Sequence, residues 1–186
     1  MSRGNSAVLA IDLINPFDYP GAVSLLRETT KALPTMRRIL RRARAAGVPV
    51  IYCNDNFGQW RSDFRTNVDH CAAEGAIGAE VVRELVPAPG DYFILKPKHS
   101  AFFETPLRIL LNQLTVKRIA LLGIATDSCI LNTALDAHML EFEVVVVRDA
   151  VAAQTPARSR RALEVLQTDR RIRAVAARSV LRWIGA

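Results

Sequence analysis

Short apolar runs alternate with amphipathic segments along the whole chain. The runs are Ala7–Asp12, Pro49–Asn54, Tyr92–Lys96, Arg118–Gly123, Phe142–Asp149 and Arg173–Ala177. Because they are apolar throughout rather than at alternate positions, we expect each to be a strand that is buried on both faces. Such strands, joined by helices, form parallel sheets covered on both sides. We therefore predict an α/β fold, a three-layer α/β/α sandwich with a six-stranded, mostly parallel, Rossmann-like sheet, in a single domain of residues 1–186.

The segments between these runs have the spacing of helices. We expect helices over Pro34–Ala46, Gly78–Leu85, Thr105–Leu114, Ser128–Leu140 and Pro156–Leu166, and a final one from Val180. Gly47 and Pro49 end the first of these helices. The segment from Asp55 to Arg65 is polar and aromatic, and we expect it to be a loop.

The charge of the chain raises the question of nucleic acid. The net charge is +7, and the arginines between Arg37 and Arg44 occupy the polar faces of one predicted helix. No aromatic residues alternate with these arginines, as they do in many surfaces that bind single strands. We interpret them as a solvated helix face and expect no nucleic-acid partner.

Hydropathy and cysteine content restrict the location. The longest apolar runs have the length of strands, so we expect no membrane span. The start of the chain does not have the pattern of a signal peptide, which favours a cytoplasmic protein. The 3 cysteines have no metal-ligand spacing and are typical of a reducing compartment.

Candidate functional residues follow several of the predicted strands. In parallel α/β sheets, ligands bind beyond the carboxyl ends of the strands, where the strand order reverses. The residues at these ends are Asp12, Asn54–Asn56, Lys96–His99 and Gly123–Cys129. We expect the active site to be built from this set.

Cys129 is the candidate nucleophile. It lies just after the fourth predicted strand and at the start of a predicted helix, where the helix dipole would lower the pKa of its thiol. Cys53 lies inside a predicted strand and is interpreted as a core residue. His138 follows Cys129 by about two and a half helical turns and so lies on the opposite helix face. Asp12 and Lys96 remain as the ionisable groups that end core strands.

Three segments carry a resemblance to a known family. AIDLINPF, ILKPKHSAFFET and GIATDSCILNTALDA resemble the signatures of the isochorismatase-like cysteine hydrolase superfamily, and GAEVVRELVPAPGDYFILKP between them also resembles it. The resemblance implies a catalytic triad of Asp12, Lys96 and Cys129. It also implies a cis peptide bond between Ile124 and Ala125, and an oxyanion hole made by the amides of Ala125 and Cys129.

The sequence departs from parts of this family. Many relatives have Gln two residues after the catalytic Asp, where this chain has Ile14. Metal-dependent nicotinamidases carry histidines after the second strand, and this chain has none there. Since Asp55 alone cannot build a nitrogen-rich metal site, we expect neither a metal nor another cofactor, and no nicotinamidase activity. Members that cleave isochorismate typically lack the nucleophilic cysteine, so Cys129 favours thiol chemistry.

Together these observations predict a cysteine hydrolase. We expect it to cleave a C–N bond of a small amide, carbamoyl or ureido molecule through a thioester on Cys129. Residues near the predicted motifs that could contact the substrate are Phe17, Asn54, Asn56, Trp60, Arg61 and Phe102. The resemblance implies a homodimer or homotetramer.

Two other functions remain open. One is hydrolysis of isochorismate or another non-amide substrate. The other is a non-catalytic binding module with an inert Cys129 and an arginine-rich face that binds nucleic acid.

Overall fold

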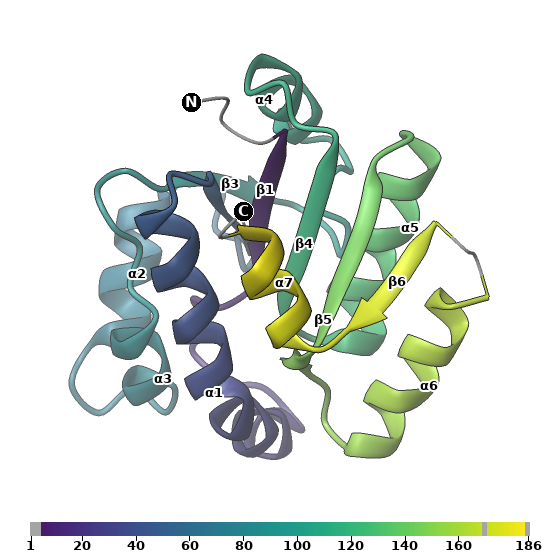
Figure 1. The fold of residues 1–186 in the computed structure, drawn as a ribbon. Coiled ribbons are helices and arrows are strands. Elements are labelled where there is room, and N and C mark those ends of the chain that lie inside the picture. The colour runs from purple at the N-terminus through teal and green to yellow at the C-terminus, as the bar shows by residue number, and fades with distance from the viewer. Residues whose placement is uncertain (1–4, 169–170, 185–186) are drawn as a thin grey trace.

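The computed structural model describes residues 5–168 and 171–184. Six parallel strands form one sheet in the order β3-β2-β1-β4-β5-β6 (Figure 1). Their bounds are β1 (Ser6–Ile11), β2 (Val50–Asp55), β3 (Tyr92–Lys96), β4 (Arg118–Ile124), β5 (Glu143–Ala152) and β6 (Ile172–Val175). The predicted α/β fold is confirmed, and the sheet is parallel throughout.

Helices cover both faces of this sheet. The helices are α1 (Ala22–Ala45), α2 (Phe64–Ala72), α3 (Ala79–Glu84), α4 (Leu107–Gln113), α5 (Leu131–Met139), α6 (Pro156–Leu166) and α7 (Ala177–Ile184), with a π-helical turn η1 (Thr126–Ile130) before α5. One apolar cluster packs α1, α2, α3 and α7 against the sheet, and a second packs α4, α5 and α6 against its other face. These are the three predicted layers.

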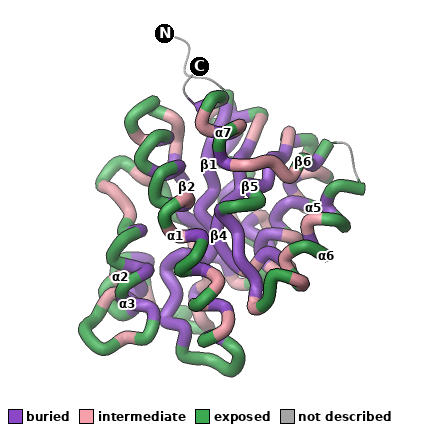
Figure 2. Tube along the Cα trace, turned by 60° about the horizontal axis from the view of Figure 1, so that its bottom comes forward, coloured by how far each residue is buried: buried purple, intermediate pink, exposed green. Residues whose placement is uncertain are grey.

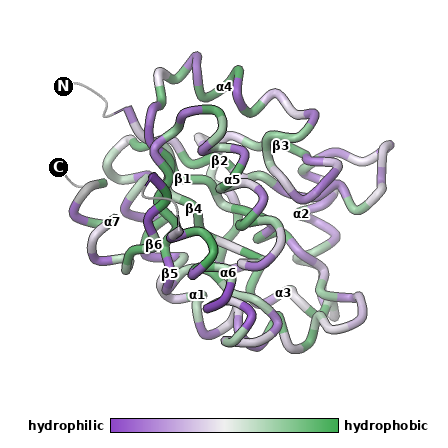
Figure 3. Tube along the Cα trace, turned by 90° about the vertical axis from the view of Figure 1, so that its right-hand side faces the viewer, coloured by the Kyte–Doolittle hydropathy of each residue, from purple (hydrophilic) through white to green (hydrophobic). Residues whose placement is uncertain are grey.

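Burial follows the layers. The central strands are buried along most of their length, while the outer sides of the helices are exposed (Figure 2). Hydrophobic residues likewise concentrate on the strands in the middle of the molecule (Figure 3). In the part of the chain that the structure describes, no helix has the length and hydropathy needed to cross a membrane.

The connection after β3 positions the functional site. The chain passes outward from β1 through β2 to β3, and then returns across the sheet to β4 on the other side of β1. The strand order therefore reverses between β1 and β4, which is where ligands bind in sheets of this kind. The segment that follows Lys96 crosses this edge on its way to α4, and the backbone N–H of Ala101 donates to Thr133 Oγ1 of α5 at 3.0 Å.

Helix α1 begins earlier than predicted. We expect it to start at Pro34, because proline favours the first turn of a helix, but α1 starts at Ala22 and contains Pro34 inside it. Proline removes one backbone donor from a helix interior. One turn before it, the hydroxyls of Thr29 and Thr30 donate to the carbonyls of Leu25 and Leu26.

Two further segments differ from the prediction. Helix α2 has no predicted counterpart; it begins after Asp63, whose side chain accepts the backbone N–H of Thr66 at 2.8 Å. The predicted helix over Ser128–Leu140 is divided, because the chain first makes the π-helical turn η1 and becomes α-helical only at Leu131. Cys129 therefore lies inside a widened turn rather than ahead of a regular helix.

Candidate active site

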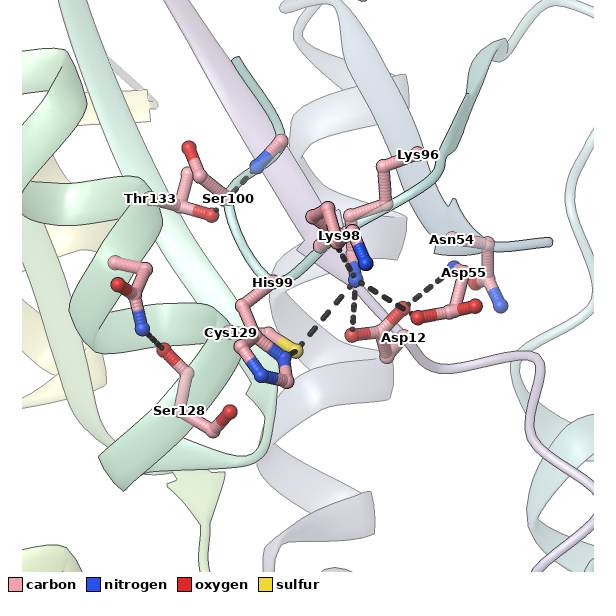
Figure 4. Close-up of polar contacts among 12 residues, drawn as sticks. Asp12, Asn54, Asp55, Lys96, Lys98, His99, Ser100, Ser128, Cys129 and Thr133 are labelled. Atoms are coloured by element: carbon pink, nitrogen blue, oxygen red, sulfur yellow. Dashed lines mark hydrogen bonds and ion pairs between the residues drawn. The ribbon is translucent and has the colours of Figure 1, made fainter. Parts of the chain in front are cut away.

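Asp12 and Lys96 form a buried ion pair at the carboxyl edge of the sheet. Asp12 directly follows β1 with a φ of 49°, and Lys96 is the last residue of β3. The Lys96 Nζ lies 2.9 Å from Asp12 Oδ2, and the Lys96 side chain is 0% exposed (Figure 4). The lysine thus extends from the outer strand β3 to the acid at the end of the central strand β1.

Cys129 completes this group. It lies in η1, which follows β4, and the strand order reverses between β4 and β1. Lys96 Nζ donates to Cys129 Sγ at 3.5 Å, and the Asp12 side chain lies close enough to this thiol to raise its pKa. Cys129 is 9% exposed, compared with 0% for Cys53 and 1% for Cys71. The structure therefore brings the three residues named by the resemblance together around one sulfur atom.

The backbone before Cys129 is irregular. The peptide bond between Ile124 and Ala125 is cis, and Gly123 before it has a φ of 121°. The carbonyl of Ala125 accepts the backbone N–H groups of Ser128 and Ile130, both at 3.1 Å. These bonds hold the π-helical turn that carries the thiol.

Electrostatics keeps the resting thiol protonated. Burial raises the pKa of Cys129 to about 12, and the charge of Asp12 adds to this, while Lys96 only partly offsets it. The prediction that a helix dipole lowers this pKa is therefore wrong for the resting site, because desolvation dominates. Burial also raises the pKa of Asp12, despite the opposing charge of Lys96. An acid with a raised pKa is a better proton acceptor than an ordinary aspartate.

Lys96 has further partners. Its Nζ lies 3.7 Å from Asp55 Oδ2 and donates to the carbonyl of Lys98 at 3.2 Å. Burial opposes its charge, but Asp12, Cys129 and Asp55 outweigh burial and raise the pKa of Lys96. Asp55 in turn donates its backbone N–H to Asp12 Oδ1 at 2.7 Å. The lysine is thus held in its charged form at the centre of the group.

Two residues near the sulfur have no role in the sequence-based prediction. The Nδ1 atom of the exposed His99 lies 3.9 Å from Cys129 Sγ. The partly exposed Tyr19 bonds to the Asn15 side chain, and the pKa of its phenol is raised by burial and by the charges of Asp12 and Cys129. His99 stands in one of the strand-end segments, but only the folded chain shows that it reaches the thiol.

Two of the predicted substrate contacts are used inside the fold. The Asn54 side chain accepts the backbone N–H of Ile14 at 3.2 Å and donates to its carbonyl at 2.5 Å, and Asn54 is 0% exposed. Phe17 is 1% exposed and packs with Ile124 in a small apolar cluster. Neither side chain has free surface in this structure, so both contribute to the packing of the fold around the site.

The remaining predicted contacts lie around the loop after β2 and the segment after β3. Asn56 is buried and accepts the backbone N–H of Gly58 at 3.0 Å. Trp60 is 78% exposed and lines, with Arg61, a hollow formed by the loop itself. The ring of Phe102 packs 5.8 Å from that of Phe142 in the core. Asp12, Lys96 and Cys129 are not among the described residues that line this hollow.

Metal-ligating side chains do not gather in this region. Within residues 5–168 and 171–184, there is no group of three or more His, Cys, Asp or Glu side chains that could hold a metal ion. Asp55, the acid after β2, is instead paired with Lys96.

Comparison with known proteins assigns the family. The sequence profile of the isochorismatase domain matches residues 6–177. The chain belongs to the isochorismatase family. This membership confirms the resemblance that the three sequence motifs carry.

Two relatives are similar over most of the length of this family member. The uncharacterized isochorismatase family protein YaaI of Bacillus subtilis (strain 168) is 35% identical over 167 residues, which cover 90% of this chain and 91% of the relative. A probable inactive nicotinamidase of Arabidopsis thaliana is 33% identical over 162 residues, which cover 82% of this chain and 83% of the relative.

Solved structures agree with the fold and the class of enzyme. A cysteine hydrolase from Pseudomonas syringae pv. phaseolicola superposes with a TM-score of 0.79 at 25% identity, covering 100% of this chain and 94% of that one. N-carbamoylsarcosine amidase from Thermoplasma acidophilum superposes with a TM-score of 0.70 at 26% identity, covering 92% and 96%. This family member is thus an isochorismatase-like hydrolase by sequence and by structure.

Proposed function

We propose that this protein is a cysteine hydrolase that cleaves a C–N bond of a small amide, carbamoyl or ureido substrate. The observation that carries the proposal is the contact of one thiol with both an acid and a lysine. Lys96 lies 2.9 Å from Asp12 and 3.5 Å from the sulfur of Cys129, and Asp12 lies close enough to the thiol to raise its pKa. This is the arrangement that an activated nucleophile requires: a nucleophile, a base within hydrogen-bond reach and a third group that orients the base.

The reaction starts with a proton transfer. Because the pKa of Cys129 is raised, its thiol is protonated at rest, and Asp12 must take the proton as the sulfur attacks the carbonyl carbon. Lys96 compensates the negative charge that moves from the acid to the sulfur. The oxyanion is stabilised by the backbone amides of Ala125 and Cys129. Asp12 then gives the proton to the departing ammonia or amine, and water hydrolyses the thioester.

The choice of a C–N bond is supported by the neighbours and by the thiol. One structural neighbour is an N-carbamoylsarcosine amidase and another is a cysteine hydrolase. A thiol that attacks a carbonyl carbon gives a thioester, an intermediate that suits acyl transfer from an amide or carbamoyl group. The name of the Arabidopsis relative, a probable inactive nicotinamidase, gives no support to nicotinamide as the substrate.

We further propose that the protein acts in the cytoplasm as a homodimer or homotetramer and needs neither a metal nor another cofactor. Its partner is a small-molecule substrate rather than a nucleic acid or a membrane. Two arginines of α1 support the absence of a nucleic-acid partner, because they already pair with acids of this chain. Arg37 pairs with Glu84 of α3, and Arg44 pairs with Asp91.

Hydrolysis of a non-amide substrate such as isochorismate is the second candidate, and it is favoured by the family to which the chain belongs. One screen separates the two. Ammonia release is measured over small amides, ureido acids and carbamoyl amino acids, and pyruvate release from isochorismate, with Cys129→Ala as the blank. We expect ammonia release that Cys129→Ala abolishes. Pyruvate release that survives in Cys129→Ala would instead assign the non-amide reaction.

A further inference from the structure

A hollow that the catalytic mechanism does not use lies beside the end of strand β5. Strands β5 and β6 pair only as far as Val147 and Val175, and β5 then continues to Ala152 beyond the end of β6 (Figure 1). Helices α1 and α6 pack on opposite faces of the sheet and flank this end of β5. The space between them has a volume of about 640 Å³, which is the size of a small-molecule site.

A bulge in β5 brings two neighbouring charged residues to this hollow. The pairing of β4 with β5 shifts register between Leu121 and Gly123, because β5 has extra residues there. Neighbouring residues of a regular strand point to opposite faces, and a bulge changes where they point. The extra residues of β5 include Arg148 and Asp149, which are both exposed and both line the hollow.

The other charged residues that line the hollow already pair with one another. Lys31 Nζ lies 2.7 Å from Glu28 Oε1 on α1, and Arg160 Nε lies 3.8 Å from Glu164 Oε1 on α6. With Arg148 and Asp149 added, the described lining has as many acids as bases. This balance of charge disfavours a polyanion as the ligand.

Arg148 and Asp149 are the two charged groups of the lining that remain for a ligand. Within residues 5–168 and 171–184, no ion pair joins them to each other or to another side chain. Asp149 Oδ1 accepts the backbone N–H of Ala177 at 2.7 Å, which orients the carboxylate and leaves its second oxygen for another donor. One guanidinium and one carboxylate, adjacent in the chain, thus border the same space.

The rest of the hollow nearest to these two residues is apolar. Val151, Ala152 and Ala153 line it and are buried. A guanidinium binds a carboxylate through two parallel hydrogen bonds, and a carboxylate binds an ammonium group. The ligand that satisfies this lining therefore has a carboxylate and an ammonium group close together, and a short apolar side chain.

We propose that this hollow binds a free α-amino acid with an apolar side chain. Arg148 pairs with its carboxylate, Asp149 pairs with its ammonium group, and its side chain lies on Val151, Ala152 and Ala153. Asp12, Lys96 and Cys129 are not among the described residues of the lining. The site therefore does not depend on the proposed hydrolase activity.

The test is isothermal titration calorimetry of the whole protein with L-alanine, L-valine and L-leucine as probes. Two analogues of leucine carry one charge each: 4-methylpentanoate lacks the ammonium group, and 3-methylbutylamine lacks the carboxylate. The variants are Arg148→Gln and Asp149→Asn, and asparagine keeps an oxygen that can accept the N–H of Ala177. Arg108→Gln is the matched control, since Arg108 is an exposed arginine on α4.

We expect at least one of the three amino acids to bind the wild-type protein. Arg148→Gln and Asp149→Asn should each weaken that binding about 10–100-fold, because each removes one charged hydrogen-bond partner. The two leucine analogues should bind more weakly than leucine by a similar factor, and Arg108→Gln should behave as the wild type.

Three results would overturn the inference. One is that none of the three amino acids binds. Another is binding that both variants leave unchanged, since the amino acid would then occupy a different site, such as the catalytic one. The third is a lower oligomer mass of Arg148→Gln in light scattering together with no amino-acid binding to the wild type, because a second copy of the chain would then cover the hollow.

Discussion

A single buried ammonium group lies near two carboxylates and one thiol in the candidate active site. Lys96 Nζ lies 2.9 Å from Asp12, 3.5 Å from Cys129 and 3.7 Å from Asp55. Its positive charge can stabilise either the carboxylate or the thiolate as the proton moves between them. Asp55 also attracts the charge of Lys96 but takes no part in the proton transfer between Cys129 and Asp12. Its charge therefore affects the pKa of Asp12.

Asp55→Asn should make the site work at lower pH. Loss of the Asp55 charge leaves Lys96 more fully available to Asp12 and removes a nearby like charge, and both effects lower the pKa of Asp12. Because Asp12 must be ionised to accept the thiol proton, the acid limb of the pH profile of kcat/KM should shift to lower pH. The asparagine oxygen can still accept the N–H of Phe57, which keeps the loop turn. A limb that stays in place would show that Asp55 does not share the charge of Lys96.

Asp12→Asn should stop acylation. Asparagine keeps the size of the side chain but cannot take the thiol proton, and loss of a positioned general base typically costs about 10²–10⁴-fold. Rapid-quench measurement of thioester formation, with the best substrate of the ammonia screen, checks this result. Thermal unfolding of the same variant serves as the control for folding. Acylation at the wild-type rate in a folded variant would remove Asp12 from the mechanism.

At the scale of elements, one glycine allows β4 to lead into the turn that carries Cys129. Gly123 has a φ of 121°, which L side chains rarely adopt, and it pairs with Ile11 of β1. A Cβ added at this position would lie 2.0 Å from the carbonyl oxygen of Ile11. The strand that leads to Ile124 and Ala125 can therefore lie against β1 only with glycine here.

Gly123→Ala should destabilise the fold and the site together. We expect the free energy of unfolding to fall by roughly 3 kcal/mol, since both the positive φ and the contact with Ile11 are unfavourable. Urea unfolding measures this change. Gly90→Ala is the matched control, because an added Cβ there meets nothing within 4 Å. Equal stability of the two variants would show that β4 adapts to a side chain at Gly123.

The bounds of the helices and strands show which of them the sequence predicts accurately. Strand β3 (Tyr92–Lys96) and helix α6 (Pro156–Leu166) have the bounds that their apolar patterns and caps predict. Helix α1 does not, because a proline favours a helix start but is tolerated inside a long helix that packs on the sheet. The spacing of apolar side chains does not predict the π-helical turn around Cys129.

For the whole molecule, Asp12, Lys96 and Cys129 lie at or just after predicted strand ends, and these ends meet because all strands are parallel and the order reverses between β1 and β4. Asp12, Lys96 and Cys129 are therefore predictable from strand ends and motifs. The substrate contacts are not, since hydrogen bonding within the loops decides which side chains remain free, as Asn54 illustrates. The proximity of His99 to Cys129 likewise depends on how the segment after β3 crosses the sheet.

Self-association is the prediction that belongs to the whole molecule. We expect a homodimer or homotetramer, because large aromatic side chains are exposed: Trp60 is 78%, Phe93 56% and Phe103 50% exposed. Burial of such surface is the usual driving force for association. Light scattering at micromolar concentration should give a multiple of the 20.6 kDa chain mass. A mass of one chain at that concentration would contradict the expectation.

The central claim is that Cys129 is the nucleophile of the hydrolase, and limited alkylation tests it most directly. Iodoacetamide is added below stoichiometry, the modified cysteines are identified by peptide mapping, and ammonia release is measured on the same samples. Burial raises the pKa of all three thiols, but Cys53 and Cys71 are only 0% and 1% exposed, whereas Cys129 is 9% exposed. Cys129 is the most exposed of the three and has a base beside it, so we predict that it is modified first and that activity falls in proportion. Modification of Cys71 or Cys53 ahead of Cys129, or full activity after Cys129 is alkylated, would contradict the account.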